Sequence, residues 1–152
     1  IPDTLRRIAH LDNIVGLKDS SGNINWLSQI LKNQSPNFRL FQGEESQILS
    51  ALRLGVVGAV PSIGNIVPDL CAKVYTSYLS GNTEAAERNQ QAIIAIHDLY
   101  LKFGNVPRIL KEYLLHKGVI TTSVSHQPFE GSLGSVCKTI DAKIRSLDRL
   151  DA

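Results

Sequence analysis

The sequence predicts an α/β fold in which parallel strands alternate with helices, and two observations predict it. Short β-branched apolar runs bounded by glycine alternate with longer runs whose apolar residues recur every three or four positions. This alternation occurs three times before residue 82, and only helical patterns follow. Three strands close no barrel by themselves, and a complete (β/α)₈ barrel takes about 250 residues. We therefore expect the C-terminal part, about three βα units, of a (β/α)₈ TIM barrel plus a three-helix C-terminal extension.

The first βα unit lies near the N-terminus. Residues 13–18 (NIVGLK) form the expected strand, and the polar turn 19–23 (DSSGN) leads into a helix. Short polar side chains before a helix accept hydrogen bonds from its free N–H groups. Ser20, Ser21 or Asn23 is therefore the expected N-cap.

The second unit begins with an expected strand over residues 38–42, which stops at Gly43. A helix is expected over residues 46–54, because its apolar residues fall on one face. Gly55 follows immediately, where a left-handed residue commonly ends a helix.

The third unit has its expected strand at residues 58–62. The following helix is expected to carry Pro68 near its first turn, where the missing N–H costs nothing, and to stop at Gly81. Ser62 and Asn65 lie between strand and helix and are candidates either to cap the helix or to bind a ligand.

The remaining sequence predicts three helices, over residues 83–103, 106–117 and 133–150, with a polar loop between the last two. We expect two regions: residues 1–82 contain the last βα units of the barrel, and residues 83–152 form the helical extension. The N-terminal part of the barrel is expected to be absent from this chain, whose first residue is not methionine.

Composition excludes several classes of function. The chain has 152 residues, 43% of them hydrophobic, and a net charge of +2 with both signs mixed along the sequence. Nucleic-acid binding needs a concentrated basic face, and a transmembrane helix needs about 20 apolar residues in succession. Neither feature is present, so we expect a cytoplasmic protein that binds neither nucleic acid nor membrane. The two cysteines are expected to be buried reduced thiols.

No metal or hydrolase motif is visible. Nucleotide-binding glycine motifs, HExxH and CxxC are all lacking. The histidines show no pairing at three or four residues, so structural or surface roles are expected for each: His10, His97, His116 and His126.

Lys18 ends a strand immediately before a turn, which is where (β/α)₈ barrels carry their catalytic side chains. An uncharged lysine amine at such a place can attack a carbonyl carbon, and the resulting imine is an electron sink for the adjacent carbon–carbon bond. On spacing alone, a surface lysine at a strand edge is the favoured interpretation.

The ends of the other two strands carry further candidates. Glycine at position 43 permits close approach of a ligand, and the carboxylates of Glu44 and Glu45 could bind hydroxyl groups. The alternative is turn chemistry, since acidic residues are favourable at a helix N-terminus.

Three segments resemble one family. The runs IVGLKDSSGN, FQGEESQILSALRLGVVGAVPSIGNIVPDL and VPRILKEYLLHKG are similar to the C-terminal half of the dihydrodipicolinate synthase and N-acetylneuraminate lyase family. The resemblance covers essentially the whole chain. It implies a class I aldolase or lyase on a (β/α)₈ barrel, in which a lysine holds pyruvate or another 2-oxo acid as an imine.

The resemblance also implies roles for individual residues. Lys18 matches the imine-forming lysine, and Ser20 matches a serine close to it. Gly43 matches a substrate-contacting glycine, and Val60 the residue whose backbone faces the imine. Glu45 and Ser62 match positions that contact the sugar-like tail of the substrate in sialate lyases, although Ser46 replaces the second acidic residue expected there.

The tyrosine proton relay and the carboxylate pocket of the family come from its N-terminal half. The four tyrosines here match neither motif: Tyr75, Tyr78, Tyr100 and Tyr113. The chain alone is therefore expected to be an incomplete enzyme, because a positioned acid–base group contributes about 10²- to 10⁴-fold to the rate.

Partners and cofactors follow from the same resemblance. The substrate is expected to be pyruvate or a related 2-oxo acid, and the assembly a homo-oligomer, a tetramer by family resemblance. No cofactor and no metal are expected, because the lysine itself supplies the electron sink. The alternative is a half-barrel binding or structural module, inactive alone, that needs a partner chain.

Overall fold

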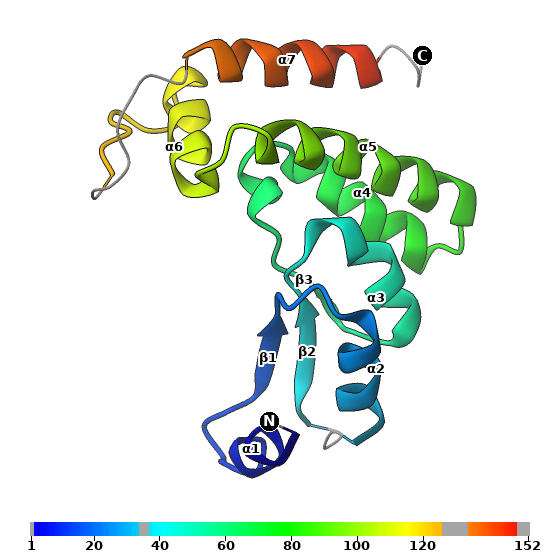
Figure 1. The fold of residues 1–152 in the computed structure, drawn as a ribbon. Coiled ribbons are helices and arrows are strands. Elements are labelled where there is room, and N and C mark those ends of the chain that lie inside the picture. The colour runs from blue at the N-terminus through cyan, green and yellow to red at the C-terminus, as the bar shows by residue number, and fades with distance from the viewer. Residues whose placement is uncertain (1, 34–36, 126–133, 149–152) are drawn as a thin grey trace.

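The computed structural model describes residues 2–33, 37–125 and 134–148. It contains a three-stranded parallel sheet with α2 and α3 on one side and the longer helices beyond the end to which the strands point (Figure 1). In chain order the elements are α1 (Pro2–Ile8), β1 (Gly16–Asp19), α2 (Ile24–Asn33), β2 (Arg39–Gln42), η1 (Glu45–Gln47), α3 (Ile48–Leu54), β3 (Gly58–Ala59), η2 (Ser62–Asn65), α4 (Pro68–Leu79), α5 (Thr83–Leu101), α6 (Val106–His116) and α7 (Gly134–Asp148).

The sheet has the strand order β1-β2-β3, and both pairings are parallel. Lys18 is in register with Phe41, which in turn pairs with Gly58. Gly16 lies so close to β2 that a Cβ atom there would collide with the carbonyl oxygen of Arg39. The predicted α/β class and its three parallel strands are confirmed.

Two strands are shorter than their sequence patterns. β1 starts at Gly16 rather than residue 13, because the N–H of Ile14 closes a turn on the carbonyl oxygen of Leu11. β3 ends at Ala59 rather than residue 62, because Pro61 has no N–H to donate and the 3₁₀ turn η2 starts at Ser62.

The N-terminal helix α1 has no counterpart in the sequence prediction. Its seven residues span about two turns, too few for an apolar periodicity to stand out. The ends of the other helices agree with the predictions to within a few residues, except that Leu133 and residues 149–150 of the predicted last helix lie outside the described residues.

The expected helix ends are largely present. Among the three N-cap candidates for α2, Asn23 accepts the hydrogen bond from Trp26 N at 3.0 Å, whereas Ser21 bonds to Asp19. Gly55 has φ 109°, the left-handed conformation expected after α3. Of the two alternatives for Ser62 and Asn65, capping of α4 is wrong, since Val67 occupies the cap position without a side-chain hydrogen bond.

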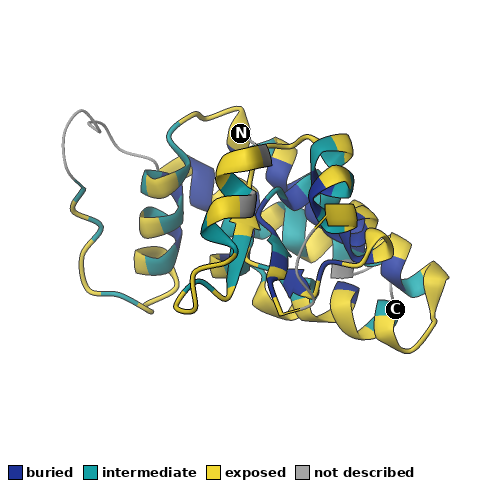
Figure 2. Ribbon diagram, turned by 90° about the horizontal axis from the view of Figure 1, so that it is seen from below, coloured by how far each residue is buried: buried dark blue, intermediate teal, exposed yellow. Residues whose placement is uncertain are grey.

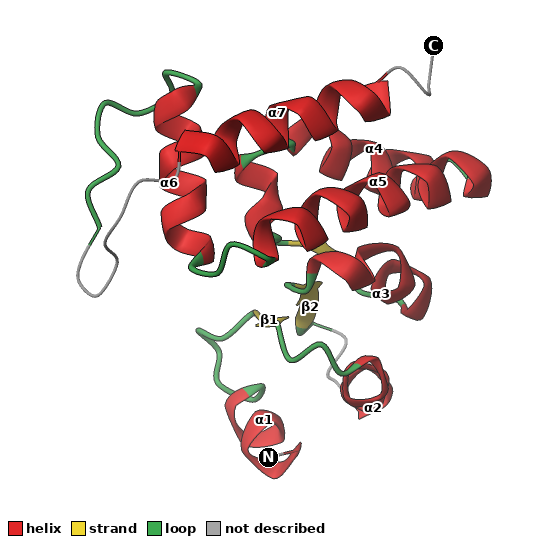
Figure 3. Ribbon diagram, turned by 45° about the horizontal axis from the view of Figure 1, so that its top comes forward, coloured by secondary structure: helices red, strands yellow, loops and turns green. Residues whose placement is uncertain are grey.

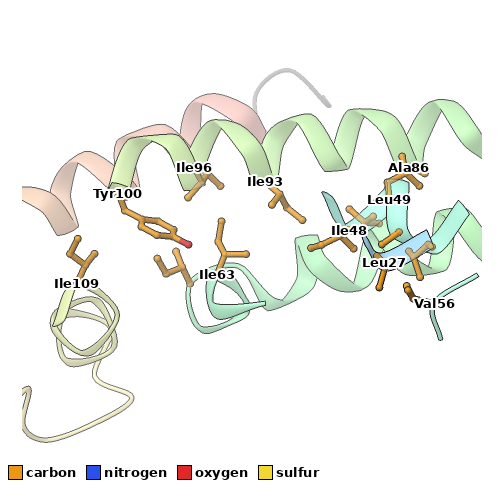
Figure 4. Close-up of a cluster of buried hydrophobic side chains, with 14 of the residues drawn as sticks. Leu27, Ile48, Leu49, Val56, Ile63, Ala86, Ile93, Ile96, Tyr100 and Ile109 are labelled. Carbon is orange, nitrogen blue, oxygen red and sulfur yellow. The ribbon is translucent and has the colours of Figure 1, made fainter. Parts of the chain in front are cut away.

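Helix α5 organises the core. It lies between α4 and α7, and its buried stripe continues into side chains from α3, η2 and α6 (Figures 3 and 4). Seen from below, exposed residues cover the outer helix faces and buried ones lie between the elements (Figure 2). Among residues 2–33, 37–125 and 134–148, no helix is both long enough and apolar enough to cross a bilayer.

Both cysteines are free thiols, but only Cys137 is buried and Cys71 is half-buried. Burial nevertheless raises the pKa of the Cys71 thiol to about 11. The expectation of a fully buried residue is therefore corrected for Cys71.

Candidate functional site

Lys18 lies on the open face of the sheet. Side chains alternate between the two faces of a strand, so Leu17 and Leu40 point toward the helices while Lys18 points away from them. Lys18 is exposed, whereas Leu40 is fully buried. The strand arrows in Figure 1 point toward the layer formed by α4 and α5, and Lys18 is the last but one residue of β1.

Gly43 brings Lys18 and Ser20 together. A Cβ atom at this glycine would collide with Cε of Lys18 and with Oγ of Ser20, and would lie 3.0 Å from the carbonyl oxygen of Asp19. Only glycine leaves room for both side chains. Three of the sequence-predicted site residues therefore converge on one point.

The backbone at Gly43 is held by Gln42. The Gln42 side chain is 1% exposed, and its Oε1 accepts hydrogen bonds from Gly43 N at 2.8 Å and Glu44 N at 2.9 Å. Gly43 N also lies 2.7 Å from the carbonyl oxygen of Asp19. The sequence analysis did not identify Gln42 as a site residue. The sequence did contain a signal, because a side-chain amide ends a buried strand directly before a glycine.

Val60 directly follows β3 and pairs with the last residue of β2. Its N–H donates to the carbonyl oxygen of Gln42 at 2.8 Å, which extends the pairing of β2 with β3 beyond the short strand. Its side chain is half exposed, at 50%. The backbone around Val60 is thereby fixed next to the Gly43 turn.

Glu45 and Ser62 bind each other. Oε1 of Glu45 accepts hydrogen bonds from Ser62 N at 2.7 Å, from Ile63 N at 3.2 Å and from the Ser62 hydroxyl. Glu45 is only 5% exposed. Burial opposes the charged form, but the Ser62 and backbone hydrogen bonds and the nearby His97 outweigh it and lower the pKa of Glu45. Substrate contact by Glu45 stays a prediction, and its hydrogen-bond partners in the structure are Ser62, Ile63 and Gln90.

Helix α5 reaches this pair with three side chains. His97 Nε2 lies 3.5 Å from Glu45 Oε2, and the Tyr100 hydroxyl lies 3.4 Å from Ser62 Oγ. The two rings meet edge to face with their centroids 5.3 Å apart. Burial raises the pKa of Tyr100 well above its ordinary value. Gln90, about two turns before His97, donates to the carbonyl oxygen of Glu45 at 2.9 Å.

Sequence reasoning did not place Gln90, His97 or Tyr100 near the candidate site. A usable signal was present, because these polar residues share the buried stripe of α5 with Ala86 and Ile93. Polar side chains on a buried stripe need partners. What the pattern could not provide was the identity of those partners on η1 and η2.

The neighbouring polar residues have local roles. Glu44 accepts from Ser46 N at 3.4 Å and from the Ser46 hydroxyl at 2.9 Å, which is the turn chemistry weighed for the acidic pair. Asn65 donates to the carbonyl oxygen of Ser62 at 2.9 Å.

One group in the described part of the chain could supply several metal ligands. Glu44, Glu45 and His97 each offer one ligand atom, and these atoms lie within 4.8 Å of one another. Oε1 of each carboxylate already accepts hydrogen bonds from the chain. The arrangement therefore fits an internal hydrogen-bond network better than a metal centre.

Comparisons with known proteins agree on one family. The model of the dihydrodipicolinate synthetase family matches residues 1–144. The 4-hydroxy-tetrahydrodipicolinate synthase of Porphyromonas gingivalis is 30% identical over 143 residues, which cover 94% of this chain and 48% of that protein. The enzyme of the same name from Archaeoglobus fulgidus is 31% identical over 107 residues, 70% of this chain and 37% of that protein.

Solved structures have the same fold. Dihydrodipicolinate synthase from Bacillus anthracis matches with a TM-score of 0.84 at 21% identity, over 95% of this chain and 49% of that one. YagE, a prophage protein of the dihydrodipicolinic acid synthase family from E. coli K12 solved in complex with pyruvate, matches with a TM-score of 0.81 at 20% identity, over 97% of this chain and 51% of that one. The chain thus spans about half the length, or less, of these proteins.

Proposed function

Because this chain belongs to the dihydrodipicolinate synthetase family, we propose that it carries the Schiff-base lysine of a lyase or aldolase that acts on pyruvate or a related 2-oxo acid. Lys18 is that residue. The convergence of Lys18, Ser20 and Gly43, where a Cβ atom has no room, is the observation that supports the assignment most directly.

The proposed chemistry starts at Nζ of Lys18. The uncharged amine adds to the keto carbon of the 2-oxo acid, and the two amine protons leave with the keto oxygen as water, which gives an imine. The protonated imine then accepts the electron pair that is released when the bond beyond the adjacent carbon breaks, which gives an enamine. In the direction of bond formation, the adjacent carbon first loses a proton to give the enamine, which donates the electron pair to the new bond. Ser20 lies beside the Lys18 side chain, where its hydroxyl can hydrogen-bond the departing oxygen.

Gly43 and Val60 are proposed to border the 2-oxo acid. Gly43 adds no side chain beside Lys18, and the backbone at both positions is fixed by hydrogen bonds to Gln42. A rigid border of this kind holds the keto carbon within reach of the amine, which is the main requirement for a rapid addition.

We also propose that the sheet is the last part of a (β/α)₈ barrel, with residues 1–82 in the barrel and residues 83–152 in the extension. The open face of the sheet supports this, since parallel sheets are normally covered on both faces. The tyrosine relay and the carboxylate pocket then come from outside the chain.

We also propose that the protein forms a homo-oligomer and that it is located in the cytoplasm. One structural relative is described as a monomeric variant of dihydrodipicolinate synthase, so a tetramer does not follow from the family alone. Sedimentation velocity of the full-length protein measures the assembly, and a monomer at working concentrations contradicts this part. An inactive binding module is less favoured, because the named relatives are synthases.

The decisive test is trapping of the imine. The full-length protein is incubated with pyruvate and borohydride, and intact mass with peptide mapping locates the adduct. We expect one pyruvate-derived adduct on Lys18 and none in Lys18→Arg, which keeps the charge but lacks a nucleophilic amine. Lys32→Arg, on α2, is the matched control and should label like the wild type. A wild-type protein without an adduct on Lys18 contradicts the assignment.

A further inference from the structure

Glu45 connects three parts of the structure that meet near Lys18. We propose that Glu45 is a positioning residue, which fixes the Gly43 turn by binding η2, the 3₁₀ turn after β3, through its carboxylate and α5 through its carbonyl oxygen. The inference rests on the proposed function of Lys18, and it replaces the expected contact between Glu45 and the substrate. What matters in this role is the reach of the side chain rather than its charge.

The carboxylate forms the first connection. Glu45 follows β2 by three residues, and the groups that it binds, Ser62 and Ile63, open the 3₁₀ turn after β3. Two backbone N–H groups and one hydroxyl converge on a single oxygen of Glu45. These N–H groups belong to the first residues of a helical turn, which have no partner inside it. A buried carboxylate that satisfies them fixes the distance between the two turns.

The carbonyl oxygen forms the second connection. Gln90 is 5% exposed and donates to Glu45 O at 2.9 Å, while its Oε1 accepts from Leu49 N at 2.9 Å. Leu49 lies in the first turn of α3, so its N–H also lacks a partner within the helix. One buried amide thereby holds both ends of the segment from Glu45 to Leu49 against α5. His97 Nε2 lies 3.5 Å from the other carboxylate oxygen of Glu45.

These hydrogen bonds also restrict the backbone at Gly43. Gln42 fixes Gly43 and Glu44 from one side, and Glu45 is fixed by two connections on the other. The gap between Gly43 and Lys18 has no room for a single additional carbon atom. Since a misplacement of about 1 Å can cost about 100-fold in rate, a loose turn at Glu45 should reduce imine formation at Lys18.

A pair of conservative variants separates reach from charge. Glu45→Gln keeps the length and an oxygen that can accept from Ser62 N and Ile63 N, but removes the charge. Glu45→Asp keeps the charge but is shorter by about one C–C bond, about 1.5 Å, and no longer reaches both N–H groups. The control for shortening a glutamate is Glu87→Asp. Glu87 lies on α5, is exposed and forms an ion pair with Arg53.

Two readouts are measured on the full-length protein: the rate of borohydride-trapped pyruvate adduct formation, and hydrogen exchange of peptides that contain Ser62 and Ile63. Glu45→Gln should retain the adduct rate within about threefold and protect both amides, whereas Glu45→Asp should lose about tenfold or more in rate and expose them. The control should match the wild type in both.

The opposite order, with Glu45→Asp faster than Glu45→Gln, overturns the proposal because it shows that charge matters. Wild-type rates in both variants with unchanged exchange overturn it as well. If the wild type itself forms no adduct, the function of Lys18 fails, and exchange at Ser62 and Ile63 still decides whether Glu45 connects the two turns.

Discussion

Replacement of Gly43 by alanine tests the site most directly. The added Cβ atom would collide with Lys18 Cε and Ser20 Oγ, and would lie 3.0 Å from the Asp19 carbonyl oxygen. The first two atoms belong to side chains that can turn away, whereas the third is backbone within the sheet. We therefore expect Lys18 to be displaced while the fold is kept.

The magnitude follows from these contacts. Excess volume in a packed site costs about 1–3 kcal/mol, and in a protein of 150–250 residues each kcal/mol lowers Tm by about 2–4 °C. Displacement of the amine by about 1 Å costs about 100-fold in rate. The variant should thus lose a few degrees in Tm but most of its rate of imine formation.

The assay is the rate of pyruvate adduct formation under borohydride, with Tm measured in parallel. Gly64→Ala is the matched control, because the nearest atom to its added Cβ is Pro61 Cγ at 3.9 Å, an ordinary contact. It should label at the wild-type rate. Wild-type labelling of Gly43→Ala would refute the reasoning, since Lys18 would then not depend on the space that glycine leaves.

Two further predictions concern stability. Ile93→Ala, at a fully buried position on α5, should lower the free energy of unfolding by about 2–5 kcal/mol in urea titrations, and a loss below 1 kcal/mol would contradict the packing described. Burial opposes ionisation of Asp141, but hydrogen bonds from His116, Tyr113 and Lys117 outweigh it and lower its pKa. A carboxyl whose folded pKa lies below its unfolded value stabilises the protein fully above the unfolded pKa, about 3.9, and loses this contribution as the pH falls through the folded value. Asp141→Asn should therefore unfold at a lower Tm than the wild type at pH 6, with the difference shrinking below pH 4; a constant difference would contradict it.

The α/β class was predictable from local patterns. The strand of β2 and the helix α3 that ends at Gly55 depend on residues that are neighbours in sequence, and both were placed to within two residues. The end of β3 was not, because the partners that convert Ser62 and Ile63 into a 3₁₀ turn include Glu45, 17 and 18 residues earlier.

The candidate site was likewise predictable only in part. Lys18 and Gly43 were found because the sequence pattern placed each at the end of a strand, and neighbouring parallel strands end at one edge of the sheet. In the structure β1 continues one residue beyond Lys18, and Gly43 directly follows β2. The family resemblance matched Glu45 and Ser62 to substrate contacts, but no pattern in the sequence indicated their bond to each other. The approach of α5 to this pair depends on packing across more than 40 residues, as in the bond from Gln90 to Glu45, and no periodicity encodes such a pairing.

The double hydrogen bond of Gln90 has a consequence for the order of folding. Its partners Leu49 and Glu45 precede it by 41 and 45 residues, so the chain must close a long loop before either bond forms. The closing entropy of such a loop is overcome only once α5 has packed onto α3 and α4. During synthesis the strands emerge first, so we expect the turn beside Lys18 to acquire its final shape only after α5 has left the ribosome. We thus expect the packing of α5, which carries no proposed nucleophile, to determine when Lys18 can react.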